Sequence, residues 1–394
     1  MNTGIIDPTP LISIDDTYRS RSTSEHDVIS VSLTDFQRTD LNNAATTSHS
    51  PTWRHPITST NAYLTKLSSI FSYKFLSWLA IDQFTQYGGV MTLLWSIALP
   101  LFKELDIDAS RQQLYTTMII SPFALKPFIG VASDLFIIRG YNKRYLALLS
   151  ILIGLVGCST LLVLFHSGSA AAAVDAGPES VRHLADFIVV CFFMMNLEGA
   201  TLDVLGEGKY SEIMSLHPES GSSIISFKFV WSLAGQILTQ IYVGPLADAG
   251  YFHVLFWIAL GLLIAPFYPT LRGWIPEKKR SSAEKGLTKL CKCQGFMFDR
   301  GLYEKKKTPL IAIAVSGLAA PIMSGVTTFS DLGIGLICSG IVLVALATLT
   351  YAVFPLKFFR VQCGLMLLVL CRPRITSGLS YYYTASEQCV PDGK

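Results

Sequence analysis

Eight apolar segments, each of about 20 residues, run through the chain and most constrain its fold. A helix rises about 1.5 Å per residue, so about 20 apolar residues cover the roughly 30 Å hydrocarbon core of a bilayer. Helices also satisfy their own backbone hydrogen bonds in lipid. The sequence therefore predicts an all-α polytopic membrane protein. The predicted spans are Leu76–Leu99, Leu114–Ala132, Tyr145–Phe165, Phe187–Leu205, Ile224–Leu246, Phe252–Leu271, Pro309–Phe329 and Ile334–Phe354.

Composition supports this class and excludes others. Charged residues make up 15% of the chain, against roughly 25% in soluble domains. The net charge of +3 is small and the basic residues lie in connections, so we expect no nucleic-acid partner. Cys291 and Cys293 form a lone C-x-C pair, so we expect no metal site and no cofactor. The chain lacks a P-loop and a nucleophile–base pattern, so we expect no enzyme activity.

Basic residues predict the orientation of the spans. They gather in the connections that follow the second, fourth, sixth and eighth spans, and eleven of them lie between Arg272 and Lys307. Such connections stay on the cytosolic side. We therefore expect the N-terminus to be cytosolic. We expect the protein to lie in the plasma membrane. Residues 1–75 are rich in Ser, Thr, Asp and Asn, and we interpret them as a disordered cytosolic tail.

The spacing of the spans predicts two unequal halves. Residues 76–271 hold six spans, residues 272–308 form a long basic linker, residues 309–354 hold two spans, and residues 355–394 form a divergent remainder. A six-helix bundle, a basic linker and further spans are the layout of the major facilitator superfamily. An equal second half would extend well beyond Lys394, so we expect an incomplete second bundle. Such a chain alone would not transport, because the midplane site lies between two halves.

Four motifs carry a more specific resemblance. They are DQFTQYGG (Asp82–Gly89), KPFIGVASDLFIIRGYNKRY (Lys126–Tyr145), EGKYSEIM (Glu207–Met214, beginning with Glu207, Gly208, Lys209 and Tyr210) and SGLSYYYTASEQCVPDG (Ser377–Gly393). With these motifs the chain resembles the folate–biopterin transporter family of the major facilitator superfamily. The resemblance implies secondary transport of folate or pteridines across a membrane. It leaves open S-adenosylmethionine as the substrate, and a truncated, non-transporting membrane protein remains a further alternative.

Polar residues inside the predicted spans are the candidate site, because a charge at a helix centre costs about 2.5 to 3.5 kcal/mol on insertion scales. We expect substrate binding or proton coupling at Glu198, Asp203, Asp82, Gln83, Lys126 and Lys228. Glu198 lies too deep in its span for a short carboxylate to reach water. Lys126 is long enough to snorkel or to pair with a carboxylate, whereas Lys228, a turn inside its span, is interpreted mainly as a snorkelling anchor.

A second candidate set surrounds the hinge between the second and third spans. It consists of Gly130, Asp134, Arg139, Lys143 and Arg144. We expect Asp134, with Lys143 and Arg144, to lock the cytosolic gate. After the fourth span, Glu207 and Lys209 are interpreted as a solvated helix end.

The expected ligand chemistry follows from a pterin and its tail. The two-donor edge of a pterin suits a carboxylate such as Glu198 or Asp203. The glutamate tail of folate suits Lys126 or Lys228, and Tyr87 or Trp231 offers a ring for stacking. A protonatable Glu198 would couple uptake to protons. A sulfonium also prefers carboxylates, so the acids do not choose the substrate. The expected partners are this small molecule and the lipid bilayer, and an oligomer is left open.

Overall fold

The structure is a computed structural model that describes residues 56–168, 172, 175–280, 287–289, 295–330 and 332–371. The chain divides after Tyr63, and Leu64–Lys394 form the unit that contains the membrane spans. Cys291, Cys293 and the motif at Ser377–Gly393 lie outside the described residues.

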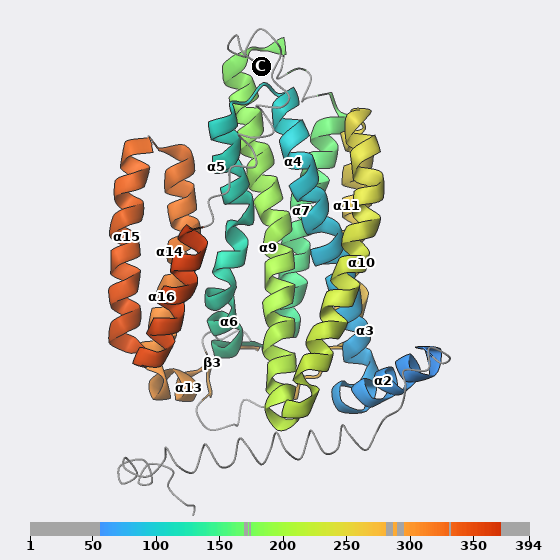
Figure 1. Cartoon of the computed structure of the whole chain (residues 1–394), viewed down its shortest axis with the longest axis vertical. Coiled ribbons are helices and arrows are strands. Elements are labelled where there is room, and N and C mark those ends of the chain that lie inside the picture. Colours follow the sequence, from blue (N-terminus) through green and yellow to red (C-terminus); the bar gives the residue numbers. More distant parts are fainter. Residues whose placement is uncertain are drawn as a thin grey trace, which may run out of the picture. The chain divides into compact units, whose positions relative to one another are not determined.

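Helices make up nearly all of the described chain (Figure 1). The first part contains α2 (Pro56–Phe71), α3 (Tyr73–Asp82), the π-helix η1 (Gln83–Met91), α4 (Thr92–Glu104), α5 (Ala109–Ile120), the 3₁₀-helix η2 (Ser121–Leu125), α6 (Lys126–Leu135), α7 (Arg144–His166), α9 (Pro178–Leu216), the 3₁₀-helix η3 (Pro218–Ser220), α10 (Gly221–Asp248), α11 (Phe252–Ile264) and α12 (Phe267–Leu271). The second part contains α13 (Arg300–Lys305), α14 (Lys307–Phe329), α15 (Leu332–Val353) and α16 (Leu356–Leu370).

The predicted class is confirmed, because seven helices of the described chain are long and apolar enough to cross a membrane. The protein is therefore an integral multi-pass membrane protein. The first predicted span corresponds to three helices that follow one another without a break: α3, the π-helix η1 and α4. The second is α5, η2 and α6, where Pro122 and Pro127 fall at helix starts because proline has no N–H to donate.

Two predicted boundaries are wrong. Residues 56–71 of the expected disordered tail form α2, whose apolar Leu64, Leu67 and Phe71 recur at helical spacing, and Leu67 and Phe71 are buried. The fourth span is also longer than expected, since α9 runs from Pro178 to Leu216. The motif at Glu207–Met214 therefore lies within a helix rather than after it, because no proline interrupts α9 after Pro178.

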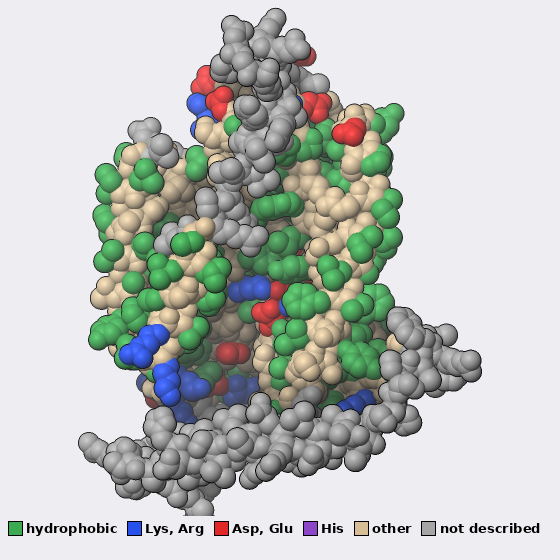
Figure 2. Space-filling view, viewed as in Figure 1, with side chains coloured by type: hydrophobic (Ala, Val, Ile, Leu, Met, Phe, Trp, Pro, Cys, Tyr) green, Lys and Arg blue, Asp and Glu red, His purple; other side chains and the backbone are tan. Residues whose placement is uncertain are grey.

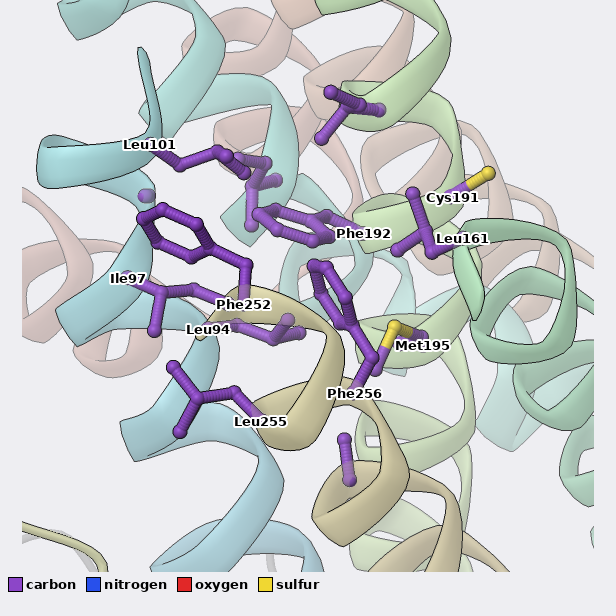
Figure 3. Packing of buried hydrophobic residues seen from close by; sticks show 14 of the residues in the cluster. Leu94, Ile97, Leu101, Leu161, Cys191, Phe192, Met195, Phe252, Leu255 and Phe256 are labelled. Atoms are coloured by element: carbon purple, nitrogen blue, oxygen red, sulfur yellow. The ribbon is translucent and has the colours of Figure 1, made fainter. Parts of the chain in front are cut away.

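The apolar core joins α4, α5, α7, α9, α10 and α11 (Figure 3). Its centre is aromatic, with Phe192 of α9 and Phe256 of α11 6.1 Å apart between ring centroids. Asn196 fixes α9 to α5 by donating from Nδ2 to the carbonyl of Ile119 at 3.0 Å. This packed set of helices supports the polar residues described below.

The second part begins against the hinge side of the second span. Figure 1 shows α14, α15 and α16 in orange and red, with α14 next to α5 and α6. The contact with α6 is close, since a Cβ on Gly317 of α14 would lie 2.7 Å from the backbone nitrogen of Phe128. Near the other end of α14, Thr328 Oγ1 donates to the carbonyl of Leu114 at 3.4 Å.

A small sheet joins the hinge to the basic linker, which the sequence did not predict. Strand β3 (Phe296–Asp299) pairs antiparallel with β1 (Phe136–Ile138) on one side and with β2 (Leu287–Lys289) on the other. Phe136 opposes Phe298, with ring centroids 5.6 Å apart. The linker is therefore hydrogen-bonded to the first half in addition to lying between the halves in sequence.

Candidate substrate and proton site

Two lysines and two carboxylates from three helices form an ion cluster within the span region. Lys126 of α6 pairs with Asp203 of α9 and lies 3.6 Å from Glu207. Lys228 of α10 reaches the same two acids, with Nζ 2.7 Å from Asp203 Oδ1 and 2.9 Å from Glu207 Oε1. Asp203 is 3% exposed, so its charge is balanced by these partners rather than by water.

The π-helix η1 adds an amide to this cluster. Gln83 Nε2 donates to Asp203 Oδ1 at 3.1 Å and to Asp82 Oδ2 at 3.0 Å, so one side chain joins two carboxylates. Asp82 and Gln83 are each 1% exposed. The widened turns of η1 also pack directly against α10, where Gly88 and Gly235 meet so closely that a Cβ on Gly235 would lie 2.3 Å from a backbone oxygen of η1. Such π-helical turns occur frequently at functional sites.

Glu198 occupies a separate buried position on α9. Its Oε1 accepts from Gln86 Nε2 of η1 at 2.9 Å, and the residue is 0% exposed. The carboxylate packs against Gly154 of α7, where a Cβ would lie 2.0 Å from Glu198 Oε2. Glycine at position 154 is therefore what makes room for this carboxylate.

Two buried carboxylate oxygens in this region, Asp82 Oδ1 and Glu198 Oε2, form no hydrogen bond among the described residues. Within the same residues neither acid has an ion-pair partner, whereas Asp203 and Glu207 each have two lysines. A buried carboxylate without a cation is costly, and taking up a proton removes that cost. Among the described residues, a proton on Asp82 or on Glu198 would thus neutralise a buried charge that has no cation beside it.

A cavity of about 580 Å³ adjoins the ion cluster. Its lining combines aromatic rings, two amides and one cation, contributed by Tyr87, Trp95, Phe123, Gln236, Gln240 and Lys126. The rings of Tyr87 and Phe123 meet edge to face at 5.8 Å, and Lys126 Nζ lies 5.5 Å from the centre of the Phe123 ring. Figure 2 shows basic and acidic side chains together at mid-height, in a hollow of this face. The volume and mixed lining suit an aromatic ligand with a polar group.

The hinge is held by a residue that sequence reasoning missed. Glu277 in the linker accepts from the backbone nitrogens of Lys143 and Arg144, at 2.7 and 3.2 Å, and so caps the start of α7. Burial raises the pKa of Glu277 although these two bonds favour its ionised form. Burial likewise lowers the pKa of Lys143, against the attraction of Asp134.

Two further hinge residues, Arg139 and Gly140, contact the linker. The backbone nitrogen of Arg139 donates to Gly295 at 2.6 Å, and that of Arg280 donates to Gly140 at 2.9 Å. Arg144 bonds to the carbonyl of Leu271 through its guanidinium. Asp134 contributes its backbone carbonyl, to which Asn142 Nδ2 donates at 3.3 Å. Glu277 joins the basic turn to the linker, and Asp134 lies close enough to Lys143 to attract it, so the lock by Asp134 stays a prediction.

The structure brings together five of the six predicted site residues. Asp82, Gln83, Asp203, Lys126 and Lys228 are connected by the contacts above, and Glu198 is bonded to the same π-helix through Gln86. Lys126 is the member of the six that lines the cavity.

Two interpretations of single residues change. Lys228 points to Asp203 and Glu207 instead of snorkelling, because two carboxylates lie within its reach. Glu207 belongs to this cluster, while Lys209 pairs with Glu212 at 2.8 Å on the outer turn of α9. The Tyr210 ring lies 5.9 Å from Lys228 Nζ, and a Cβ on Gly208 would lie 2.8 Å from Lys143 Nζ.

Of the two aromatic side chains expected to stack on the ligand, one lines the cavity. Tyr87 lines the cavity, whereas the ring of Trp231 packs edge-on against Phe84 and Phe227. Sequence reasoning missed Gln86, Gln236 and Gln240. A signal was present for Gln86, which follows Gln83 by three residues and therefore shares its helix face.

The model of the BT1 family matches residues 88–386, more than half of the chain. No curated protein and no solved structure matches the chain.

Proposed function

The chain belongs to the BT1 family, the folate–biopterin transporter family, and on that premise we propose that it is a proton-coupled transporter of folates. Membership supports transport of folate- or biopterin-type substrates or related ones. The choice of folate and of protons rests on the cavity and the acids beside it.

The cavity lining carries the choice of substrate. Among the described lining residues there is one lysine and no carboxylate. A folate has a pterin ring to stack between aromatic side chains and a carboxylated tail for Lys126. Biopterin lacks that carboxylate. S-adenosylmethionine also carries a carboxylate, but its sulfonium would find no carboxylate among the described lining residues, so this lining favours a folate.

The pterin edge needs an acceptor other than the one first expected. Asp203 already accepts from Lys126, Lys228 and Gln83, and Glu198 is fully buried away from the lining. The side-chain amides of Gln236 and Gln240 line the cavity and offer both donors and acceptors to a pterin.

Protons that are carried together with an anionic substrate would offset its charge. Moving one elementary charge against a membrane potential costs about 2.3 kcal/mol per 100 mV. A folate with one glutamate carries two carboxylates, and two buried acids here, Asp82 and Glu198, lack cations among the described residues. Protonation of both acids would make the import of such a folate electrically neutral.

Uptake by the whole protein in sealed liposomes tests this function, and it also tests the opposing expectation that an incomplete second bundle prevents transport. We expect labelled folate to accumulate when the outside is made acidic, and excess unlabelled folate to abolish the signal. Biopterin and S-adenosylmethionine should compete weakly, because neither offers a carboxylated pterin. Strong competition by S-adenosylmethionine with none by folate would overturn the substrate assignment. Folate accumulation that ignores the proton gradient would overturn the coupling.

A further inference from the structure

A continuous chain of polar contacts runs from the cavity to a buried acid. Lys126 lines the cavity and pairs with Asp203 Oδ2. Asp203 Oδ1 accepts from Gln83 Nε2, and the same nitrogen donates to Asp82 Oδ2. The far oxygen of Asp82 has no partner among the described residues. An amide nitrogen carries two hydrogens, so Gln83 can serve both carboxylates at once.

The second buried acid is not connected in this way. Glu198 accepts from Gln86, and within the described part of the chain the side-chain amide of Gln86 leads to Glu198 alone. Gln83 is therefore the side chain through which a change at the cavity reaches an acid that can hold a proton. It lies on η1, whose close contact with α10 positions it between α9 and α10.

We infer that Gln83 is a positioning residue that couples occupation of the cavity by a substrate carboxylate to binding of a proton at Asp82. The inference rests on the proposed function and specifies how its two ligands communicate. It gives Gln83, one of the residues that the sequence placed in the candidate site, the specific role of linking the two ligands.

The coupling follows from competition for Lys126. A substrate carboxylate that binds Lys126 withdraws part of the positive charge from Asp203. The side-chain amide of Gln83 then donates its hydrogen bonds to Asp203 and no longer to Asp82. A hydronium ion transfers its proton to Asp82 Oδ1 and leaves as water, and the new O–H bond takes the charge of Asp82 from −1 to zero, so Asp82 no longer needs the amide. Release of that proton on the other side reverses the step.

The charged groups around Asp82 agree with this direction. Asp203 and Glu198 act on its charge from α9, Lys126 from α6 and Lys228 from α10. When a substrate anion occupies Lys126, the negative charge near Asp82 increases, which favours its neutral form. Substrate and proton therefore strengthen each other's binding by the same factor.

The test compares Gln83→Met with the wild-type protein in liposomes. Methionine keeps the length of the side chain but removes both amide hydrogens. Wild-type affinity for folate should rise at least about fivefold as the outside is acidified, which is the lower end of typical coupling energies. Gln83→Met should lose this pH dependence and no longer accumulate folate, yet still exchange labelled for unlabelled folate at equal pH. The matched control is Gln112→Met, a buried glutamine of α5 outside the cluster.

Asp82→Asn provides an independent arm. It keeps an acceptor for Gln83 but cannot bind a proton as a carboxylate does, so it should lose the same pH dependence. The double variant should lose no more than either single one, because both changes break one pathway. If Gln83→Met does not reach the membrane, the pH dependence of Asp82→Asn decides.

The outcomes separate the inference from the proposed function. A wild-type protein that does not accumulate folate contradicts the function. A wild-type protein that accumulates folate, together with a Gln83→Met or Asp82→Asn variant of unchanged pH dependence, overturns the inference alone. A Gln83→Met variant that loses exchange as well as accumulation indicates a structural role and also overturns it.

Discussion

At the scale of single residues, Lys126 lies where it can bind two different anions, the carboxylate of Asp203 and a carboxylate of the substrate. It is bound to Asp203, and its ammonium group also lines the cavity where a substrate carboxylate would lie. Lys228 still holds Asp203 when Lys126 turns away, so the cluster can lend one lysine to a ligand without leaving a buried acid unpaired.

Lys126→Met should therefore weaken folate transport selectively. A hydrogen bond to a charged group contributes about 1.5 to 3 kcal/mol, so the KM for folate should rise roughly tenfold or more. Binding of biopterin, which has no carboxylate, should change little. Competition assays with both compounds measure this, with Lys103→Met as the control because Lys103 is exposed in the last turn of α4. Equal weakening of both ligands would show that Lys126 does not read the carboxylate.

Glu198 and Gly154 form a pair that can be tested from either side. Glu198→Gln keeps the shape but loses the titratable group, so proton-driven accumulation should fall roughly tenfold or more while the protein level holds. Gly154→Ala should have a similar effect, because its Cβ would lie 2.0 Å from Glu198 Oε2. Gly261→Ala in α11 is the control, since nothing lies within 4 Å of its Cβ position. Accumulation at the wild-type level in Glu198→Gln would remove Glu198 from the coupling.

At the scale of elements, the hinge and the linker are joined by more than the chain connectivity. The β1–β3 ladder, the Glu277 cap and the bond from Arg280 to Gly140 all join residues 136–144 to residues 277–299. Arg280 also pairs with Asp299 at 2.8 Å, and Asp299 caps α13 by accepting from Leu302 at 2.8 Å. These contacts connect the hinge to the start of α14.

A cross-link across β1 and β3 tests whether hinge and linker move together. Phe136 and Phe298 are opposite each other, so Phe136→Cys with Phe298→Cys should form a disulfide in a protein from which the eight native cysteines have been removed. Uptake should persist after oxidation, because we expect the sheet to stay intact through the cycle. Loss of uptake that returns on reduction, and that neither single cysteine shows, would mean that the sheet opens.

Elements differ in how far the sequence predicted them. The apolar spans were predictable, because about 20 apolar residues in a row admit few structures. The π-helix was not, since DQFTQYGG has no signal that distinguishes a widened turn from an ordinary one. The sheet was missed because β1 and β3 are short, and each needs the other to pair. Lys228 was misjudged because depth along a helix does not reveal which carboxylates a neighbouring helix presents.

At the scale of the whole molecule, the orientation remains a prediction. Basic residues place the N-terminus and the linker in the cytosol, and the linker contains Cys291 and Cys293. In intact cells these two thiols should resist an impermeant thiol reagent and react once the membrane is opened. A variant with Cys291 and Cys293 replaced controls for the other thiols. Labelling of the two thiols in intact cells would contradict the predicted orientation and indicate the opposite one.

The most direct test of proton-coupled folate transport measures how much labelled folate the purified protein accumulates in liposomes. The internal pH is held constant while the external pH is lowered, and a protonophore is added in a parallel sample. We predict that internal folate exceeds external folate only while the gradient lasts, and that the protonophore abolishes the excess. Protein in the membrane that accumulates no folate under the gradient would contradict this function and favour a non-transporting role.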